Sequence, residues 1–488
     1  MDLLFKDADW TADELVNADG EIRRIAEDEL RLETYPNQFE LITYEQMLDA
    51  YASVGLPVMY SHWSFGRLRA MEEKGYRQGK NGLAYELVIN SNPCVNYLME
   101  TNTSVLQALV IAHAGYGHNS FFKNNYAFKD GVDASFILDY LAYAKAYVAE
   151  CEKKYGPKIV ENVLDAAHAL KDWGVDYGKR PQPLTKKEIE EEEVKRREQE
   201  ARDRLLEWEV LKPAATSPDA QADEEIRWPE SPEENILYFV EKNALNMPNW
   251  KRELIRIVRR IEQYLHPQMG SKVMNEGWAT FTHYYIMTRL HEKGGLSDGQ
   301  YLEFLRSHTA VVQTRGITAS INPYHLGFNM FTDIRRICEN PTEAERKEFD
   351  FAGEKDWVSV LQYAAYNFRD ESFIRQFLSA KVVADMQMAV LTDEDDYMEI
   401  SHVASEDTYK EVRKKLADRY LDILRVPDLR VYKVNRWGDR RLIVKRYDDD
   451  RGKLLGDVDL TLRHLAYLWS YDVELIADGE SHIAITGG

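Results

Sequence analysis

The chain has 488 residues, of which 44% are hydrophobic and 30% charged, a mixture typical of a soluble protein that folds without disulfides or a structural metal. Its 62 basic and 83 acidic residues give a net charge of −21, which argues against binding to nucleic acid or to anionic membrane surfaces. The three cysteines, Cys94, Cys151 and Cys338, lie far apart without metal-binding spacing, and this predicts a reduced, cytoplasmic protein.

The amino-terminal third is predicted to be mainly helical. The first ten residues carry an early acid and no basic run before apolar residues, so we expect no secretory signal. Helical patterns cover residues 13–31 and 44–54, and the second stops before Gly55 and Pro57. Residues 83–90 alternate and are rich in Leu, Val and Ile, which fits either a strand or a buried turn of helix.

Residues 101–122 form the longest stretch without charge. Its 22 residues are enough to cross a bilayer, but amide and hydroxyl side chains and two His lead us to expect no membrane span. Apolar residues at helical spacing predict a helix over 105–113, and similar patterns predict helices over 133–154 and 159–173.

The composition changes over residues 185–234, which hold 17 acidic and 9 basic residues. The first half fits a solvated helix of interleaved charges, whereas the second half contains four prolines and fits a flexible linker. We interpret this segment as a solvent-facing insertion, and the alternative is a partner-binding role.

Helical periodicity resumes at residue 233 and continues to about 388, with breaks at 246–249 and 294–299. After Pro427 the pattern changes. The elements expected there are strands at 429–434 and 440–447 around a Trp-Gly-Asp turn, a helix at 460–469 and a last strand near 482–486.

These patterns predict a mostly α-helical protein with a small α+β domain at its carboxyl end. The predicted parts are an amino-terminal helical part (1–184), the charged insertion (185–234), a second helical part (235–400) and the small domain (401–488).

Three stretches avoid charge but keep hydrogen-bonding side chains. Residues 101–122 and 316–332 have no charged residue, and residues 273–288 have only Glu276, yet all three are rich in His, Asn, Thr and Tyr. Such segments suit the lining of a buried polar cavity, whereas a plain core would use more Leu and Ile.

His113 and His118 are candidate metal ligands in the first of these stretches. On a regular α-helix a spacing of five places two side chains about 140° apart. Both side chains can bind one metal only if Gly115 and Gly117 let the helix bulge or end. The alternative is a pair of buried histidines satisfied by hydrogen bonds.

Glu276 is the candidate third ligand, since a lone buried carboxylate must be neutralised by a proton, a base or a cation. Thr280 and His283 lie four and seven residues further, on the same helix face. Because His and carboxylate together form the usual divalent site, we predict a metal held by His113, His118 and Glu276, with His283 as a further ligand or acid–base group. The alternative is a protonated or Arg-paired core glutamate.

Further residues are candidates for supporting roles. His325, Asn329 and Asp333 share a helix face, so Asp333 is a candidate ligand, a carboxylate that orients a His, or a cap. Glu86, a lone acid in an uncharged segment, is the candidate general base. Residues expected to orient or surround the ligands are Asn275, Thr280, His325, Asp333 and Lys123.

Residues 275–279, Asn-Glu-Gly-Trp-Ala, resemble the Asn-Glu-Gly-Phe-Ala element of gluzincin aminopeptidases, in which the Glu is the third zinc ligand. This resemblance implies that His113 and His118 correspond to the two His of HExxH. The spacing is one residue longer, however, and Ala114 stands where the catalytic Glu is expected. The resemblance therefore extends to gluzincin-like metal binding, and ordinary peptidase chemistry is not expected.

Several motifs together resemble the SpoVR (stage V sporulation protein R) family. They are Leu-Pro-Val-Met-Tyr-Ser-His-Trp-Ser-Phe-Gly (56–66), Tyr-Glu-Leu-Val-Ile-Asn (85–90) with Asn-Pro (92–93), the His-containing segment 112–125, Asn-Glu-Gly-Trp-Ala (275–279) and Asn-Pro-Tyr-His-Leu-Gly (322–327). The five-residue His spacing is similar to the proteobacterial branch. The resemblance implies a cytoplasmic protein linked to spore cortex formation in spore formers and to starvation or stress elsewhere, alongside a serine protein kinase and a von Willebrand-type partner.

Three functions are consistent with this sequence. The first is a hydrolase of an amide or peptide bond that depends on a divalent metal, zinc. The second is a non-enzymatic adaptor of a kinase-dependent stress pathway, in which residues 188–234 and the carboxyl-terminal domain carry the binding. The third is an oxidoreductase or ligand sensor that holds iron or manganese.

Overall fold

A computed structural model of the chain forms two compact units, which we call unit 1 (residues 1–146 and 267–424) and unit 2 (residues 147–266 and 425–488). The structure describes residues 1–47, 59–60, 62–63, 86–175, 228–229, 231–313, 321–388, 390–394, 397–401, 406–423, 426–447 and 457–486. Most of the predicted charged insertion, the greater part of the helix expected at 44–54 and most of motif 56–66 lie outside these residues.

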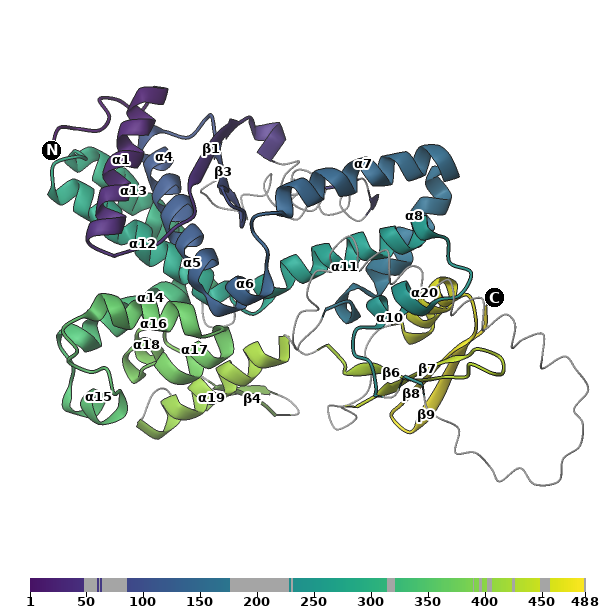
Figure 1. Cartoon of the computed structure of the whole chain (residues 1–488). Helices are drawn as coiled ribbons and strands as arrows, with labels where there is room; N and C mark the ends of the chain where they lie inside the picture. The colour runs from purple at the N-terminus through teal and green to yellow at the C-terminus, as the bar shows by residue number, and fades with distance from the viewer. Residues whose placement is uncertain are drawn as a thin grey trace, which may run out of the picture. The chain divides into compact units, whose positions relative to one another are not determined.

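The amino-terminal helix α1 (Ala12–Asp28) confirms the helix predicted there (Figure 1). Thr11 and Glu14 form a capping box, in which each side chain bonds the backbone N–H of the other residue. One face buries Leu15, Ile22 and Ile25 against the rest of unit 1.

A small sheet follows, and part of it was not predicted. It consists of β1 (Asn37–Ile42), β2 (Glu86–Ile89) and β3 (Cys94–Met99) in the order β1-β3-β2, with β1 parallel and β2 antiparallel to β3. The strand alternative for residues 83–90 is therefore the correct one for 86–89. Strand β3 is mostly buried on both faces, so it lacks the alternation by which half-buried strands are recognised.

A continuous helical segment carries the predicted helix at 105–113 and then changes its winding. Helix α4 (Ser104–Val110) leads directly into a π-helix, η1 (Ile111–His118), and then into α5 (Asn119–Asn124). Every residue of η1 is buried. Helix α6 (Tyr126–Gly131) completes this part of unit 1.

The predicted second helical part (235–400) is helical as far as Asp385, but two strands occupy its end. Helix α12 (Lys272–Glu292) packs against both η1 and α14 (Pro323–Glu339). Helix α13 (Asp298–Val311) lies between α12 and α14 in the sequence. The remaining elements of unit 1 are α15 (Glu343–Glu348), α16 (Trp357–Asn367), α17 (Asp370–Phe377), α18 (Ala380–Asp385), β4 (Val390–Glu394), β5 (Tyr397–Ser401) and α19 (Glu406–Ile423).

Unit 2 contains the predicted carboxyl-terminal α+β fold. Strands β6 (Leu429–Val434), β7 (Leu442–Arg446), β8 (Val473–Ala477) and β9 (Glu480–Ala484) form one sheet in chain order, with only β7 and β8 parallel to each other. Helix α20 (Val458–Trp469) connects the parallel pair. Strand β8, a short strand directly after α20, was not predicted from the sequence.

Helices from the middle of the chain complete unit 2. They are α8 (Pro157–Ala169), the 3-10 helix η2 (Lys171–Trp173) and α10 (Ile236–Asn243), while α7 (Ile137–Tyr155) and α11 (Asn249–Met269) carry residues of both units. Within the described part of the chain, no helix has the length and apolar character needed to cross a membrane, in agreement with the prediction.

Candidate metal centre

The π-helix η1 brings together the two histidines whose spacing is wrong for an α-helix. Its i→i+5 hydrogen bonding widens the turn and brings residues five apart closer to the same face than they lie on an α-helix. His113 and His118 therefore project from one face, and their ring centroids are 4.6 Å apart. This is the bulge that the sequence analysis required if both side chains were to reach one metal.

Asparagine side chains hold η1 against β1 and β3. The Nδ2 of Asn37 donates to the carbonyl oxygen of Gly115 at 2.9 Å, and its Oδ1 accepts from Asn96 at 3.0 Å and from Asn119 at 2.8 Å. Asn119 also accepts from the backbone N–H of Tyr35 at 2.8 Å. These bonds fix the start of β1 against η1, so the first strand anchors the unusual helix.

Close approaches at glycine set the distance between η1, α12 and α14. A Cβ on Gly117 would lie 2.6 Å from the Cα of Ala279, and a Cβ on Gly277 would lie 2.4 Å from the Cα of Gly327. Real Cβ contacts essentially never reach these distances. The missing side chains therefore allow α12 to carry Glu276 close to the two histidines.

The three predicted ligands converge in unit 1. The Oε2 of Glu276 lies 3.5 Å from Nε2 of His118 and 3.8 Å from Nε2 of His113. Within the described residues these three side chains form the one group whose ligand atoms all lie within 4.8 Å of one another. Atoms bound tetrahedrally to zinc at about 2.0–2.1 Å are separated by roughly 3.4 Å, and the two nitrogen–oxygen distances are close to this separation.

The surroundings of Glu276 favour its ionised form. Burial raises its pKa, but hydrogen bonding to His113, the charges of His118 and His113 and hydrogen bonding to Tyr324 together outweigh burial, so the pKa lies below its ordinary value. A carboxylate, rather than a neutral carboxyl group, therefore faces the two imidazoles.

His118 is oriented by the residue that precedes Glu276. Its Nδ1 lies 2.8 Å from Oδ1 of Asn275, and an amide oxygen can only accept, so Nδ1 carries the proton. In the neutral ring Nε2 then has a lone pair directed at Glu276. The ring of Phe122 stacks on that of His118, with centroids 5.9 Å apart.

His113 begins a row of three histidines. Its Nδ1 lies 2.7 Å from Nδ1 of His283, whose Nε2 lies 3.0 Å from Nδ1 of His308. Burial and the neighbouring histidines hold the pKa of His283 well below its ordinary value, and burial together with His113 lowers the pKa of His308 to about 4. His283 thus lies behind His113 as seen from Glu276.

His308 and Tyr324 are site residues that the sequence analysis did not single out. His308 lies beside charged Arg306, outside the three uncharged stretches, so no local signal marks it. Tyr324 belongs to the motif at 322–327, and its ring stacks on that of His113 with centroids 6.5 Å apart.

Three further residues were predicted to surround the ligands, namely Thr280, His325 and Lys123. Thr280 is fully buried, and its Oγ1 makes no hydrogen bond within the described part of the chain. His325 is half-buried, and Asn329 donates to its carbonyl oxygen at 2.8 Å. Lys123 donates to the carbonyl oxygen of Thr34 at 3.0 Å.

Asp333 and Glu86 are the two other acidic residues that were predicted to serve the site. Asp333 accepts from Arg336 and from Ser379, each at 2.6 Å, and thereby ties α14 to the start of α18. Glu86 begins β2, where its backbone pairs with Leu98, and its side chain lies outside the described part of the structure.

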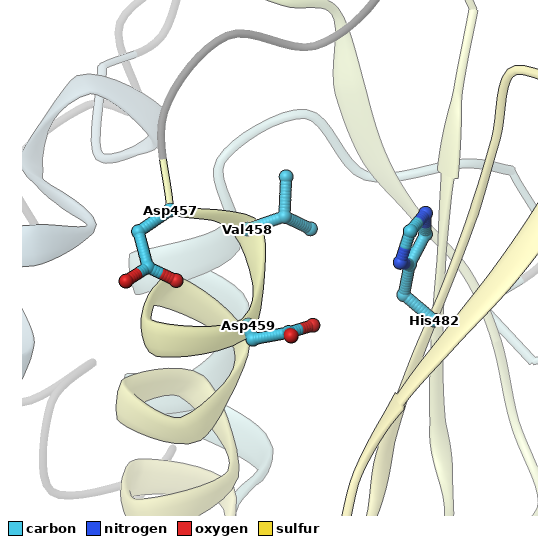
Figure 2. Close-up of a pocket in the computed structure, with 4 residues that line it drawn as sticks. All are labelled: Asp457, Val458, Asp459 and His482. Carbon is cyan, nitrogen blue, oxygen red and sulfur yellow. The ribbon is translucent and has the colours of Figure 1, made fainter.

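Unit 2 has a shallow hollow beside α20, lined by Asp457, Val458, Asp459 and His482 (Figure 2). Asp457 caps α20, because its carboxylate accepts from the backbone N–H of Leu460 at 2.9 Å. The hollow contains none of the three proposed metal ligands.

Comparison with known proteins agrees with the motifs. The family model described as SpoVR like protein matches residues 9–424, and the SpoVR-like C-terminal domain matches residues 427–478. The chain belongs to the SpoVR family. It is 46% identical over 483 residues to the Uncharacterized protein YcgB of Escherichia coli (strain K12), covering 97% of this chain and 93% of that protein.

The SpoVR relative from Escherichia coli supports the assignment to the proteobacterial branch that the His spacing indicated. No solved structure matches the chain.

Proposed function

We propose that unit 1 is a metal-binding hydrolase module in which His113, His118 and Glu276 hold one divalent ion, zinc. The observation that carries this proposal is the approach of two imidazole nitrogens to one buried carboxylate oxygen, at 3.5 and 3.8 Å, across a π-helix. Two neutral imidazoles and one carboxylate are a donor set that catalytic zinc uses, with a fourth position left for water or substrate.

In this proposal the chain's own residues supply binding, orientation and exclusion of water. Asn275 holds the ring of His118, and the stacked rings of Phe122 and Tyr324 cover the two histidines. A bound zinc ion would polarise a carbonyl group and lower the pKa of water, which suits hydrolysis of an amide or peptide bond.

The general base is the part of the mechanism that differs from gluzincins. Ala114 occupies the place of the glutamate in HExxH, so another group must accept the proton from water. We propose Glu86 for this role, since β2, which it begins, packs against η1.

The decisive experiment is elemental analysis of protein purified without a His tag or chelator. We expect about one zinc per chain in the wild type and loss of that zinc in Glu276→Ala and His118→Ala. His291→Ala is the matched control, because His291 lies on the same helix as Glu276 but pairs with Asp298 at 2.9 Å, and its zinc content should be unchanged. Stoichiometric zinc in Glu276→Ala and His118→Ala would overturn the ligand assignment.

Membership of the SpoVR family supports a role in sporulation or in the response to starvation and stress, alongside a serine protein kinase and a von Willebrand-type protein. We propose that the metal module acts in such a pathway. If the wild type contains no metal, that result would favour the adaptor function instead. If it contains iron or manganese in place of zinc, that result would favour an oxidoreductase or a sensor.

A further inference from the structure

We propose that strand β9, at the edge of the carboxyl-terminal sheet, pairs with β9 of a second copy of this chain, so that the protein forms a dimer with a two-fold axis. This inference is independent of the proposed metal centre, because it concerns unit 2 alone. It rests on the backbone groups and isoleucines on the side of β9 that faces away from β8. We call that side the free edge.

The two edges of the carboxyl-terminal sheet differ. Its strand order is β6-β7-β8-β9, so β6 and β9 each have one side that no strand of the sheet covers. At β6 the chain's own residues cover that side, since Glu233 exchanges two backbone hydrogen bonds with Val431, at 3.0 and 2.8 Å. Among the described residues, no backbone hydrogen bond of this kind reaches β9.

The turn between β8 and β9 determines which backbone groups point to the free edge. Its two residues, Asp478 and Gly479, have φ values of 54° and 78°, as in a type I′ turn. In a two-residue hairpin the residues that flank the turn exchange hydrogen bonds, and bonded pairs alternate with unbonded pairs along the antiparallel ladder. The N–H and C=O groups of Ser481 and Ile483 therefore point away from β8.

The side chains along β9 leave this edge open to another strand. Ile483 is 51% exposed and Ile485 is 68% exposed, whereas Ala484 is buried on the face that α20 covers. Edge strands of soluble proteins usually carry charge, proline or a bulge that prevents pairing. Residues 481–486 contain no Asp, Glu, Lys, Arg or Pro, and the register between β8 and β9 is regular. The free edge is thus suited to the addition of a strand.

A second copy of the chain fits because β9 is complementary to itself. If the two-fold axis passes beside Ile483, antiparallel pairing places Ile483 opposite Ile483 of the second copy and Ser481 opposite Ile485 of the second copy. The backbone groups at the two free edges then meet, and four isoleucines lie together on one face of the joined sheet. Glu480 lies opposite Thr486 of the second copy, so carboxylates do not face each other although the chain has a net charge of −21.

The first test is sedimentation of the full chain. One strand from each copy buries less than the roughly 800 Å² per partner of a standard stable interface, so we expect a reversible dimer that depends on protein concentration. Over about 1–100 µM, the range in which weak complexes dissociate, the wild type should pass from monomer to dimer. I483K should remain monomeric over the same range, because two lysines would face each other at the centre of the ladder.

I159K is the matched control for this substitution. Ile159 is 48% exposed and lies on α8 of the same unit, away from the carboxyl-terminal sheet in sequence. The control adds the same charge at an isoleucine of similar exposure, so it should form dimers like the wild type. Circular dichroism of both variants shows whether they keep the fold.

The second test is disulfide formation in I483C. Opposite residues of a hydrogen-bonded antiparallel pair have Cα atoms about 5.5 Å apart, a distance that a disulfide spans. The three native cysteines are buried, so mild oxidation should leave them unpaired. We expect a covalent dimer of I483C on a non-reducing gel and no covalent dimer of I159C.

The outcomes of the two tests decide the proposal. A wild type that sediments as a monomer at every concentration would overturn it. A dimer that persists in folded I483K would also overturn it, because another surface would then hold the two copies together. If I483K does not fold, I483C decides: failure to form the disulfide while the wild type dimerises would refute the pairing of β9 with itself.

Discussion

Glu276, in the second turn of α12, and Asp370, the first residue of α17, carry carboxyl groups whose surroundings shift their pKa values in opposite directions. Asp370 accepts from the backbone N–H groups of Val273 at 3.0 Å and Met274 at 2.9 Å, at the amino end of α12. Burial nevertheless raises the pKa of Asp370 to about 6, with the charge of Glu276 adding to the rise. The facing histidines explain why the pKa of Glu276 falls instead.

The raised pKa of Asp370 predicts how stability depends on pH. The pKa of the Asp370 carboxyl group is near 6 in the folded state and about 3.9 in the unfolded state. Protonation of this group therefore stabilises the folded state most below pH 4, and this contribution to the free energy of unfolding is lost as the pH rises through 6. Relative to Asp370→Asn, the free energy of unfolding of the wild type should therefore fall by roughly 2 kcal/mol between pH 4 and pH 6. Urea denaturation in the presence of a chelator measures this, and a pH-independent difference between the two proteins would contradict it.

At the scale of elements, the position of η1 against α12 decides whether there is a site. Helix η1 supplies two proposed ligands and α12 the third, and Gly117 lies where the two helices are closest. Because a side chain at position 117 would collide with α12, a glycine is needed there although glycine disfavours helix formation.

Gly117→Ala is expected to separate η1 from α12. The new Cβ would lie 2.6 Å from the Cα of Ala279, and this overpacking should cost about 1–3 kcal/mol and abolish zinc binding. Gly20→Ala is the matched control, because a Cβ at Gly20 in α1 meets nothing within 4 Å. That control should stabilise the protein by about 0.5–1 kcal/mol and keep its zinc. Thermal unfolding and metal analysis of both variants test this, and full zinc content in Gly117→Ala would refute it.

At the scale of the whole molecule, the carboxyl-terminal strands belong to a compact unit that also contains residues 147–266. Helix α20 packs against α8, and the ring of Trp469 stacks on that of Phe239 with centroids 5.9 Å apart. Trp173 donates to the carbonyl oxygen of Pro427 at 2.9 Å. The segment matched by the C-terminal family model therefore buries its apolar face against helices from the middle of the chain.

This packing predicts that residues 427–488 do not fold alone. Without α8 and α10, α20 would lose its packing against α8 and Trp469 would lose the ring of Phe239, which would expose apolar surface to water. We expect the isolated fragment to bind a hydrophobic dye and to unfold without a cooperative transition, and a fragment of residues 147–266 joined to 427–488 to unfold cooperatively. A cooperative transition in the short fragment would contradict this prediction.

Much of this organisation was predictable from local patterns. The helices near residues 13–31 and 105–113, the helical character of residues 233–388, the α+β texture after Pro427 and the three charge-poor stretches were recognised, because helix periodicity and charge avoidance are properties of neighbouring residues. The three stretches also contained His113, His118 and Glu276, the residues that the structure brings together. The family was recognised from short motifs, and comparison with known proteins confirmed it.

Other features arise only from contacts between distant residues. The sequence analysis found that two histidines five apart need a bulged helix, but bonds from Asn37 and Asn119 and the close approach at Gly117 hold the π-helix in place. The contact between His113 and His283 spans 170 positions, and His308 joins it from a third helix. Such contacts leave no periodic signal.

Local patterns along the chain thus specify the mostly helical fold class and identify the family of this protein. The tertiary structure decided which polar side chains face one another, because a buried hydrogen bond or metal ligand is selected by the geometry of packed helices rather than by its neighbours in the chain.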